Sequence, residues 1–106
     1  MNIQTITDQT FDRFIAVGGV AVVELGAEWC TFCKSAHDTL ARLSGENPGK
    51  ARFGYADIDT ATGLAQRFGV TTLPTIIFFK DGKPSGELVG RGCTGKAIHK
   101  ACEKLI

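Results

Sequence analysis

The sequence has no long hydrophobic run and no excess of charge of one sign. Its longest apolar stretch covers residues 20–23 and ends at Glu24, whereas a membrane-spanning helix needs about 20 apolar residues. Lys and Arg number 12 and Asp and Glu 11, a formal net charge of +1, so no strong field attracts nucleic acid or anionic lipid. Residues 1–8 lack the basic and apolar regions of a signal peptide. We therefore expect a cytoplasmic protein that binds neither nucleic acid nor membranes.

Cysteine is also scarce, with 4 residues in a chain of 106, which is too few for a small fold held together by several disulfides. Hydrophobic residues make up 43% and charged residues 22% of the chain, proportions that are typical of a globular protein. A chain of this length builds one core rather than two. We predict that residues 1–106 form a single domain that acts as a monomer.

Apolar residues recur at helical spacing in several segments, and residues that favour a helix start or end flank each of them. These patterns predict helices over residues 8–17, from the cysteines at 30 and 33 to residue 43, over residues 64–68 and over residues 98–105. Thr7 or Asp8 would cap the first helix, and Thr94 the last. Ser44-Gly45 and the turn residues 47–49 would end the second.

Runs of β-branched and aromatic residues predict strands between these helices. They cover residues 20–25, 51–58, 76–79 and 87–89. A hairpin turn at residues 80–83 separates the last two, and the first has the uniform apolar character of a strand buried on both faces. The predicted order of helices and strands also begins with a strand before the first helix, but no residues are assigned to that strand. This order predicts an α/β domain of three layers, with helices flanking a central mixed β-sheet.

Cys30 and Cys33 stand at a spacing that favours redox chemistry. Residues three apart are neighbours on a helix, so these two thiols can close a small disulfide ring. If Cys30 opens the helix, its sulfur lies beside unpaired backbone N–H groups and the positive end of the helix dipole, which favour the thiolate. Cys30 is therefore the expected nucleophile. Cys33, one turn further on, would stay protonated until it resolves a mixed disulfide.

A metal site is the alternative interpretation of the same cysteines, because zinc sites also use this spacing. A structural zinc needs further ligands, and Cys93 and Cys102 lie about 13.5 Å apart if their segment is helical. They therefore form neither a second ligand pair of the same kind nor a disulfide with each other. His37 could complete a triplet with Cys30 and Cys33. We expect redox chemistry and no metal ligands.

Four segments of the sequence resemble the thioredoxin family. The run Trp29-Cys30-Thr31-Phe32-Cys33-Lys34, preceded by a buried strand, is similar to the family's Trp-Cys-Gly-Pro-Cys-Lys site. Residues 70–75 resemble its cis-proline segment, and Val89-Gly90 resembles the glycine that keeps its substrate groove open. Glu24 occupies the place of the family's buried aspartate. Order and spacing agree over nearly the whole chain.

The resemblance implies the thioredoxin fold and a thiol-disulfide oxidoreductase that reduces protein disulfides without a bound cofactor. A thioredoxin reductase or a related flavoprotein would supply the electrons. Glu24 would exchange a proton with Cys33, since burial should raise the pKa of its carboxyl group; alternatively, Glu24 faces solvent at a sheet edge or pairs with a lysine. A cis Leu73-Pro74 bond would shape the groove for a substrate strand. The expected substrate-binding residues are Trp29, Thr31, Phe32, Leu73, Pro74 and Gly90.

The sequence also departs from the family pattern. Thr31-Phe32 replaces Gly-Pro between the cysteines, which predicts a redox potential that differs from that of the usual reductant without giving the direction. Tyr55 stands where the family has a lysine partner for its buried carboxylate. Cys93, in a loop expected at the site, is either a regulatory thiol or a packing residue, and Cys102 belongs to the core. Because of Thr31-Phe32, an oxidant or isomerase is an alternative. Two other classes stay open: a redox-sensing binding module without turnover, and a metal or iron-sulfur carrier in which Cys30 and Cys33 bridge two chains.

Overall fold

A computed structural model describes residues 3–106 of the chain. Met1 and Asn2, part of the segment compared with a signal peptide above, lie outside the described residues. A short 3₁₀ turn, Gly90–Gly92, follows the last strand. The other elements, in chain order, are β1 (Ile3–Thr5), α1 (Phe11–Ala16), β2 (Val20–Gly26), α2 (Thr31–Glu46), β3 (Ala51–Asp57), α3 (Thr62–Arg67), β4 (Thr75–Lys80), β5 (Lys83–Val89) and α4 (Gly95–Leu105).

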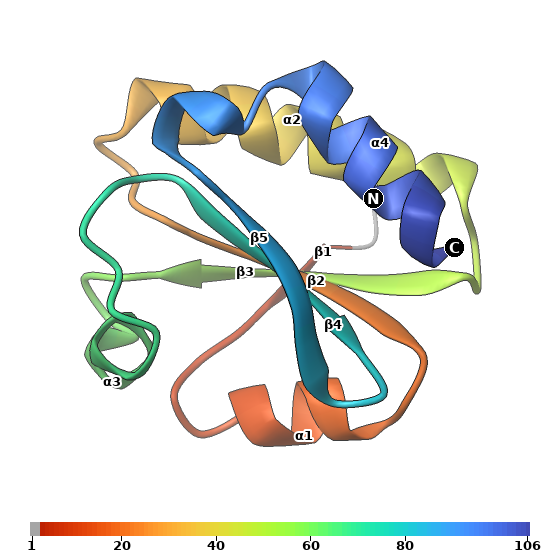
Figure 1. The fold of residues 1–106 in the computed structure, drawn as a ribbon. Helices are drawn as coiled ribbons and strands as arrows, with labels where there is room; N and C mark the ends of the chain where they lie inside the picture. Colours follow the sequence, from red (N-terminus) through yellow and green to blue (C-terminus); the bar gives the residue numbers. More distant parts are fainter. Residues whose placement is uncertain (1–2) are drawn as a thin grey trace.

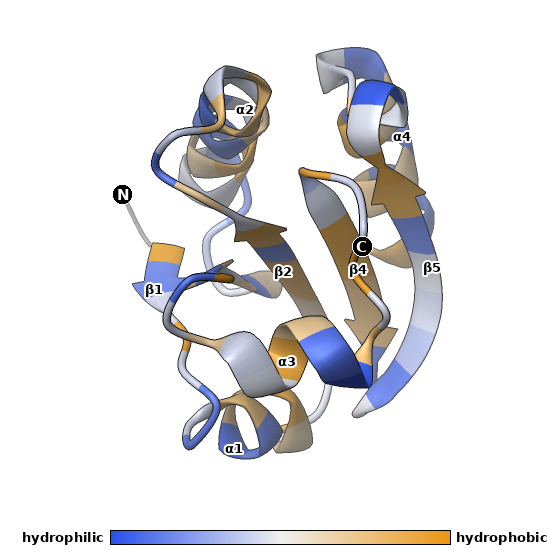
Figure 2. Cartoon of the chain, turned by 90° about the vertical axis from the view of Figure 1, so that its left-hand side faces the viewer, coloured by the Kyte–Doolittle hydropathy of each residue, from blue (hydrophilic) through white to orange (hydrophobic). Residues whose placement is uncertain are grey.

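The strands form one mixed sheet in the order β1-β3-β2-β4-β5. Strands β1, β3 and β2 run parallel, whereas β4 is antiparallel to both β2 and β5. Helices α2 and α4 cover one face of the sheet, and α1 and α3 cover the other (Figures 1 and 2). The predicted three-layer α/β architecture with a central mixed sheet is therefore confirmed.

Strand β2 lies at the centre of the molecule and is buried along its whole length. Its side chains alternate between two cores, as a strand requires. Ala21, Val23 and Leu25 pack with α1 and α3, while Val20 and Val22 pack with α2 and α4. By the same alternation Glu24 faces α2, the helix that carries the paired cysteines.

The start of the first helix differs from the prediction, because α1 begins at Phe11 rather than near residue 8. Thr7 and Thr10 accept hydrogen bonds from each other's backbone N–H through their side-chain oxygens and form a turn ahead of the helix. Asp8 caps a different helix: its carboxylate accepts from the N–H groups of Gly63 and Leu64 at 3.0 and 2.9 Å, at the start of α3.

Two other boundaries also differ. Helix α2 continues through Ser44 to Glu46. Asn47 caps its end, where its backbone and side-chain nitrogens both donate to the carbonyl oxygen of Leu43. Strand β5 begins at Lys83, four residues before the predicted start at residue 87. Residues 84–86 contain Pro and Gly, which are poor strand formers, but β5 is an edge strand that tolerates them, and a bulge at Phe78 and Phe79 accommodates the pairing.

Replacing Asp8 by Ala is expected to destabilise the protein by about 1 kcal/mol, because two N–H groups at the start of α3 lose their acceptor. Urea unfolding monitored by circular dichroism measures the effect. Asp12→Ala is the matched control, since its ion pair with Arg67 is exposed on both sides and should contribute less than about 0.5 kcal/mol. Equal losses in the two variants would contradict the capping role of Asp8.

Candidate active site

Three segments meet at one end of the sheet because of its register. Leu25, near the end of β2, pairs with Thr75 at the start of β4, and Thr75 pairs with Val89 at the end of β5. The loop that leads to Cys30, the segment before Thr75 and the turn that follows Val89 therefore lie together. These segments carry most of the site residues expected from the sequence.

Cys30 and Cys33 form a disulfide, with their Cα atoms 5.3 Å apart. Cys30 is the N-cap of α2, as predicted, and its sulfur accepts a hydrogen bond from the backbone N–H of Cys33 at 3.2 Å. Cys30 is half-buried, whereas Cys33 is only 2% exposed. A disulfide partner approaching from solvent therefore meets Cys30 first, and its position at the helix start favours a thiolate there after reduction.

Gly26, which the sequence analysis did not single out, allows the close packing around Cys33. A Cβ atom at this position would lie 3.1 Å from Cys33 Sγ and 3.2 Å from a ring carbon of Tyr55. Both neighbours belong to packed elements, so a larger residue would displace the sulfur of Cys33. The only sign of this close packing in the sequence was a glycine at the end of a buried strand.

Glu24 is fully buried, 0% exposed, beneath α2. Burial, and to a lesser degree the negative charge of Asp38, raises the pKa of its carboxyl group from 4.5 to about 8. Glu24 is therefore largely protonated at neutral pH. Because Glu24 is fully buried in the central strand, it does not face solvent at a sheet edge. The partner of its carboxyl group is a histidine rather than a lysine.

His37 is that partner. Its Nδ1 lies 3.3 Å from Glu24 Oε1, and its ring packs edge-on against Tyr55 with the centroids 5.3 Å apart. From the sequence, His37 was expected only as a possible metal ligand, although its position four residues after Cys33 places it on the same face of α2. Within residues 3–106, no group of three or more His, Cys, Asp and Glu residues is arranged to hold a metal ion.

The Leu73-Pro74 peptide bond is cis. The carbonyl oxygen of Pro74 accepts a hydrogen bond from the backbone N–H of Gly90 at 2.7 Å and lies 3.6 Å from the thiol of Cys93. Pro74 and Gly90 are buried, and Leu73 is half-buried. The segments before β4 and after β5 are thus joined by backbone contacts beside the end of β2.

Apolar side chains are exposed around these segments. Trp29 is 69% exposed, and its indole N–H donates to Asp59 at 3.1 Å. Phe32 and Val89 are 37% and 42% exposed, and Thr31 is also exposed. Such a surface suits contact with varied protein partners. Asp59 and the exposure of Val89 were not anticipated from the sequence.

A Gly90→Ala substitution is expected to lower stability by about 1–2 kcal/mol and to raise the KM for a disulfide substrate. Gly90 has a left-handed φ of 57°, which is costly for alanine, and an added Cβ would lie 2.8 Å from Thr72 Cγ2. Unfolding curves and steady-state kinetics measure the two effects. Gly92→Ala is the control, because nothing lies within 4 Å of a Cβ there; equal effects at both sites would contradict the argument.

The remaining cysteines, Cys93 and Cys102, are buried free thiols. Burial raises the pKa of each to about 11, and for Cys93 the charge of Glu24 adds to the effect. Both thiols are therefore protonated at neutral pH and poorly nucleophilic. Cys102 packs in the core as expected, and the environment of Cys93 favours the packing interpretation over the regulatory one.

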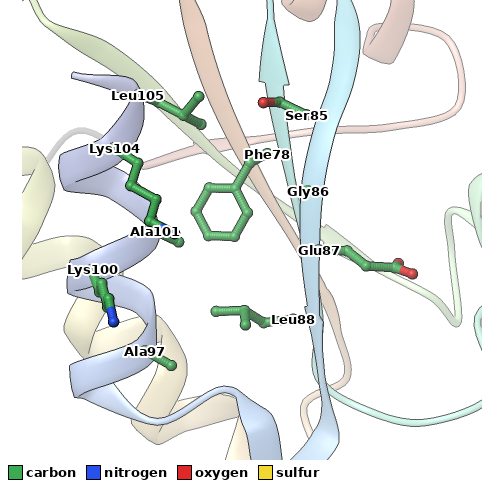
Figure 3. A pocket seen from close by; sticks show the side chains of 10 residues that line it. All are labelled: Phe78, Ser85, Gly86, Glu87, Leu88, Ala97, Lys100, Ala101, Lys104 and Leu105. Atoms are coloured by element: carbon green, nitrogen blue, oxygen red, sulfur yellow. The ribbon is translucent and has the colours of Figure 1, made fainter.

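A hollow of about 420 Å³ lies between α4 and β5. Figure 3 shows Phe78 and Leu88 pointing toward α4, while Glu87 points away on the other side of β5. Its lining contains neither of the paired cysteines nor Glu24. This hollow is therefore separate from the site at the end of the sheet.

Comparison with known proteins gives a consistent result. The thioredoxin family model matches residues 2–104. The chain is 40% identical over 90 residues to the thioredoxin of Staphylococcus haemolyticus, which is 85% of this chain and 86% of that protein, and 37% identical over 90 residues to that of Staphylococcus aureus. The solved structure of mitochondrial thioredoxin 3 from Saccharomyces cerevisiae, in its oxidised form, has a TM-score of 0.87 at 29% identity, covering 97% of this chain and 95% of that one.

Proposed function

This chain belongs to the thioredoxin family and is a protein-disulfide oxidoreductase with a Cys30–Cys33 redox pair, and we propose that it acts as a reductant, with Cys30 as nucleophile and Cys33 as resolving thiol. The observation that carries the roles of nucleophile and resolving thiol is the position of Cys30 at the N-cap of α2, with Cys33 buried one turn behind it. Residues 1–106 act as one monomeric domain in this proposal.

The reaction begins when the Cys30 thiolate attacks a substrate disulfide. One substrate sulfur leaves as a thiolate, and a mixed disulfide joins Cys30 to the other. Cys33 then gives its proton to the ionised form of Glu24 and attacks Cys30, which releases the second substrate thiolate and forms the Cys30–Cys33 disulfide. Two electrons pass to the substrate in total. A flavoprotein reductase returns the pair to the dithiol form.

The substrate segment would bind beside the cis proline, with its backbone extended against the segment around Leu73 and Pro74. Gly90 adds no side chain beside this segment, where a Cβ would lie 2.8 Å from Thr72 Cγ2. The exposed rings of Trp29 and Phe32, together with Thr31, would contact the substrate's side chains. These contacts need no strong charge, in keeping with a net charge of +1.

We place the activity in the cytoplasm, where reducing conditions suit a protein that reduces disulfides. Within residues 3–106 no helix has the length and apolar character needed to cross a bilayer.

A redox titration tests the proposed direction. The purified protein is equilibrated in dithiothreitol or glutathione buffers, and the Cys30–Cys33 pair is trapped and quantified by mass. We expect a midpoint below about −220 mV, toward the value of about −270 mV found for a reducing thioredoxin. A midpoint near −180 to −120 mV, in the range of isomerases and strong oxidants, would overturn the reductant proposal in favour of the reverse direction.

Two further measurements distinguish a catalyst from a binding module and from a metal carrier. Catalytic reduction of a protein disulfide, with many substrate molecules turned over per protein, is expected and contradicts a binding module without turnover. Stoichiometric zinc or iron in the protein purified under reducing conditions would instead support a carrier that uses both cysteines as ligands.

A further inference from the structure

His37 connects the buried carboxyl group of Glu24 to solvent. Its Nδ1 lies 3.3 Å from Glu24 Oε1, and its side chain is 34% exposed whereas that of Glu24 is 0% exposed. An imidazole ring accepts a proton on one nitrogen and releases a proton from the other. The pair therefore supplies a path for a proton between the protein interior and water.

Glu24 needs such a path if it serves as a base. A carboxyl group whose pKa burial raises to about 8 holds its proton at neutral pH, so that proton must leave before Glu24 can accept the proton of Cys33. Tyr55, which stands where the family has a lysine, keeps its own proton because burial and nearby acidic groups raise its pKa to about 12. Tyr55 is thus a poor proton acceptor, and its ring supports His37 instead.

The surroundings of His37 form a pocket of about 480 Å³ that also contains Cys33. Cys33 and His37 therefore line the same pocket, on one face of α2. The titratable and charged groups that face His37 come from β2, β3, the loop before α2 and α2 itself: Glu24, Tyr55, Glu28, Cys33, Lys34 and Asp38.

We propose that His37 relays the proton of Glu24 to solvent during the resolving half-reaction, an inference that rests on the proposed function above. Cys33 transfers its proton to the Glu24 carboxylate and attacks Cys30. The Cys30–Cys33 bond forms, the bond from Cys30 to the substrate sulfur breaks, and the leaving thiolate takes the electron pair. The carboxylate is available because Glu24 has first passed its own proton to Nδ1 of His37, and the imidazolium has released a proton to water. His37 acts through Glu24 and is a positioning residue.

The test uses the full-length reduced protein and one equivalent of the symmetric disulfide of thionitrobenzoate. Cys30 attack releases the first coloured thiolate, and Cys33 attack on the resulting mixed disulfide releases the second. Stopped-flow absorbance therefore reports the two half-reactions as separate phases. His37→Gln keeps a hydrogen-bonding group of similar size but cannot carry a proton, and His37→Ala leaves space for added imidazole.

We expect both substitutions to slow the second phase about tenfold or more near pH 7 and to leave the first phase unchanged. Added imidazole should restore the second phase of His37→Ala in proportion to its concentration. A second phase of His37→Gln as fast as that of the unsubstituted protein would overturn the relay and leave only a structural contact. Failure of imidazole to restore any rate would also contradict it.

Two comparisons make the result specific. His99→Gln removes a histidine on α4 that pairs with the exposed Glu103, and it should change neither phase. In the Glu24→Gln background, His37→Gln should cause no additional slowing, because the relay acts through Glu24; full additivity would overturn that route. Failure of the proposed roles of Cys30 and Cys33 is distinct, since the unsubstituted protein would then release fewer than two equivalents of thiolate, and the redox titration tests the direction separately.

Discussion

Replacing Cys30 by Ser should abolish the reduction of protein disulfides, lowering turnover on the order of 10³-fold or more, because a serine hydroxyl does not replace a thiolate nucleophile. The fold should survive, since Cys30 is half-buried at a helix N-cap and serine is itself a good N-cap residue. A turnover assay with a reducing system and circular dichroism on the same sample measure the two properties. Substantial turnover in Cys30→Ser would remove the basis for the enzymatic assignment.

Replacing Cys33 by Ser should give a different result. Cys30 remains able to attack, but the mixed disulfide is no longer resolved, so the protein accumulates covalently bound to its substrate. Mass spectrometry of peptides identifies the bond and should place it on Cys30. A bond on Cys93 or Cys102 would contradict the assignment, because burial keeps both thiols protonated.

Cys102→Ala controls for the loss of a thiol as such. This residue packs in the core between the sheet and α4, so the substitution costs some stability but should leave turnover per folded molecule unchanged. The contrast between the variants separates a chemical role for the pair from a general need for cysteine. Equal loss of turnover in Cys102→Ala and Cys30→Ser would contradict the division of the four cysteines into a redox pair, Cys30 and Cys33, and two packing residues.

Glu24 should make the stability of the oxidised protein depend strongly on pH. Its folded pKa is about 8 and its ordinary value is 4.5, so between these values the folded protein binds more protons than the unfolded chain. The free energy of unfolding must then fall as pH rises from about 4.5 to about 8. Below that range both states are protonated, and above it both are ionised. The loss from this single group is on the order of 5 kcal/mol.

Glu24→Gln should remove this pH dependence, because the amide is neutral throughout. Urea unfolding of the oxidised proteins at several pH values between 5 and 8 measures it, and the variant should gain stability relative to the original chain as pH rises. Glu46→Gln is the matched control, since Glu46 is 55% exposed beside Arg42 and its substitution should not alter the slope. A difference between Glu24→Gln and the original chain that stays constant with pH would rule out a raised pKa.

Local features of the structure followed from the sequence. Thr94 caps α4 by accepting a hydrogen bond from the N–H of Ala97 at 3.1 Å. Asp81 and Gly82 adopt left-handed φ values of 49° and 83° in the predicted hairpin turn. These features depend on residues within a few positions of each other, so backbone preference and side-chain capping predict them directly.

Features that depend on contacts between distant segments did not follow from the sequence. Asp8 has the character of a cap, but its partners at Gly63 and Leu64 lie more than fifty positions away. The length of β5 depends on its pairing with β4, which overrides the poor strand preference of its Pro and Gly residues. Neither pairing has a local signal in the chain.

For the active site, the sequence by itself determined the cysteine pair, its place at the start of a helix and a carboxyl group within a buried strand. Spacing and hydrophobic pattern carry this information, because a helix start and an apolar strand are local properties. Only the tertiary structure decided that Glu24 faces α2, that His37 is its partner and that Cys93 lies against Pro74. Each of those contacts joins two segments that lie far apart in the chain, and the order of strands in the sheet brings the segments together.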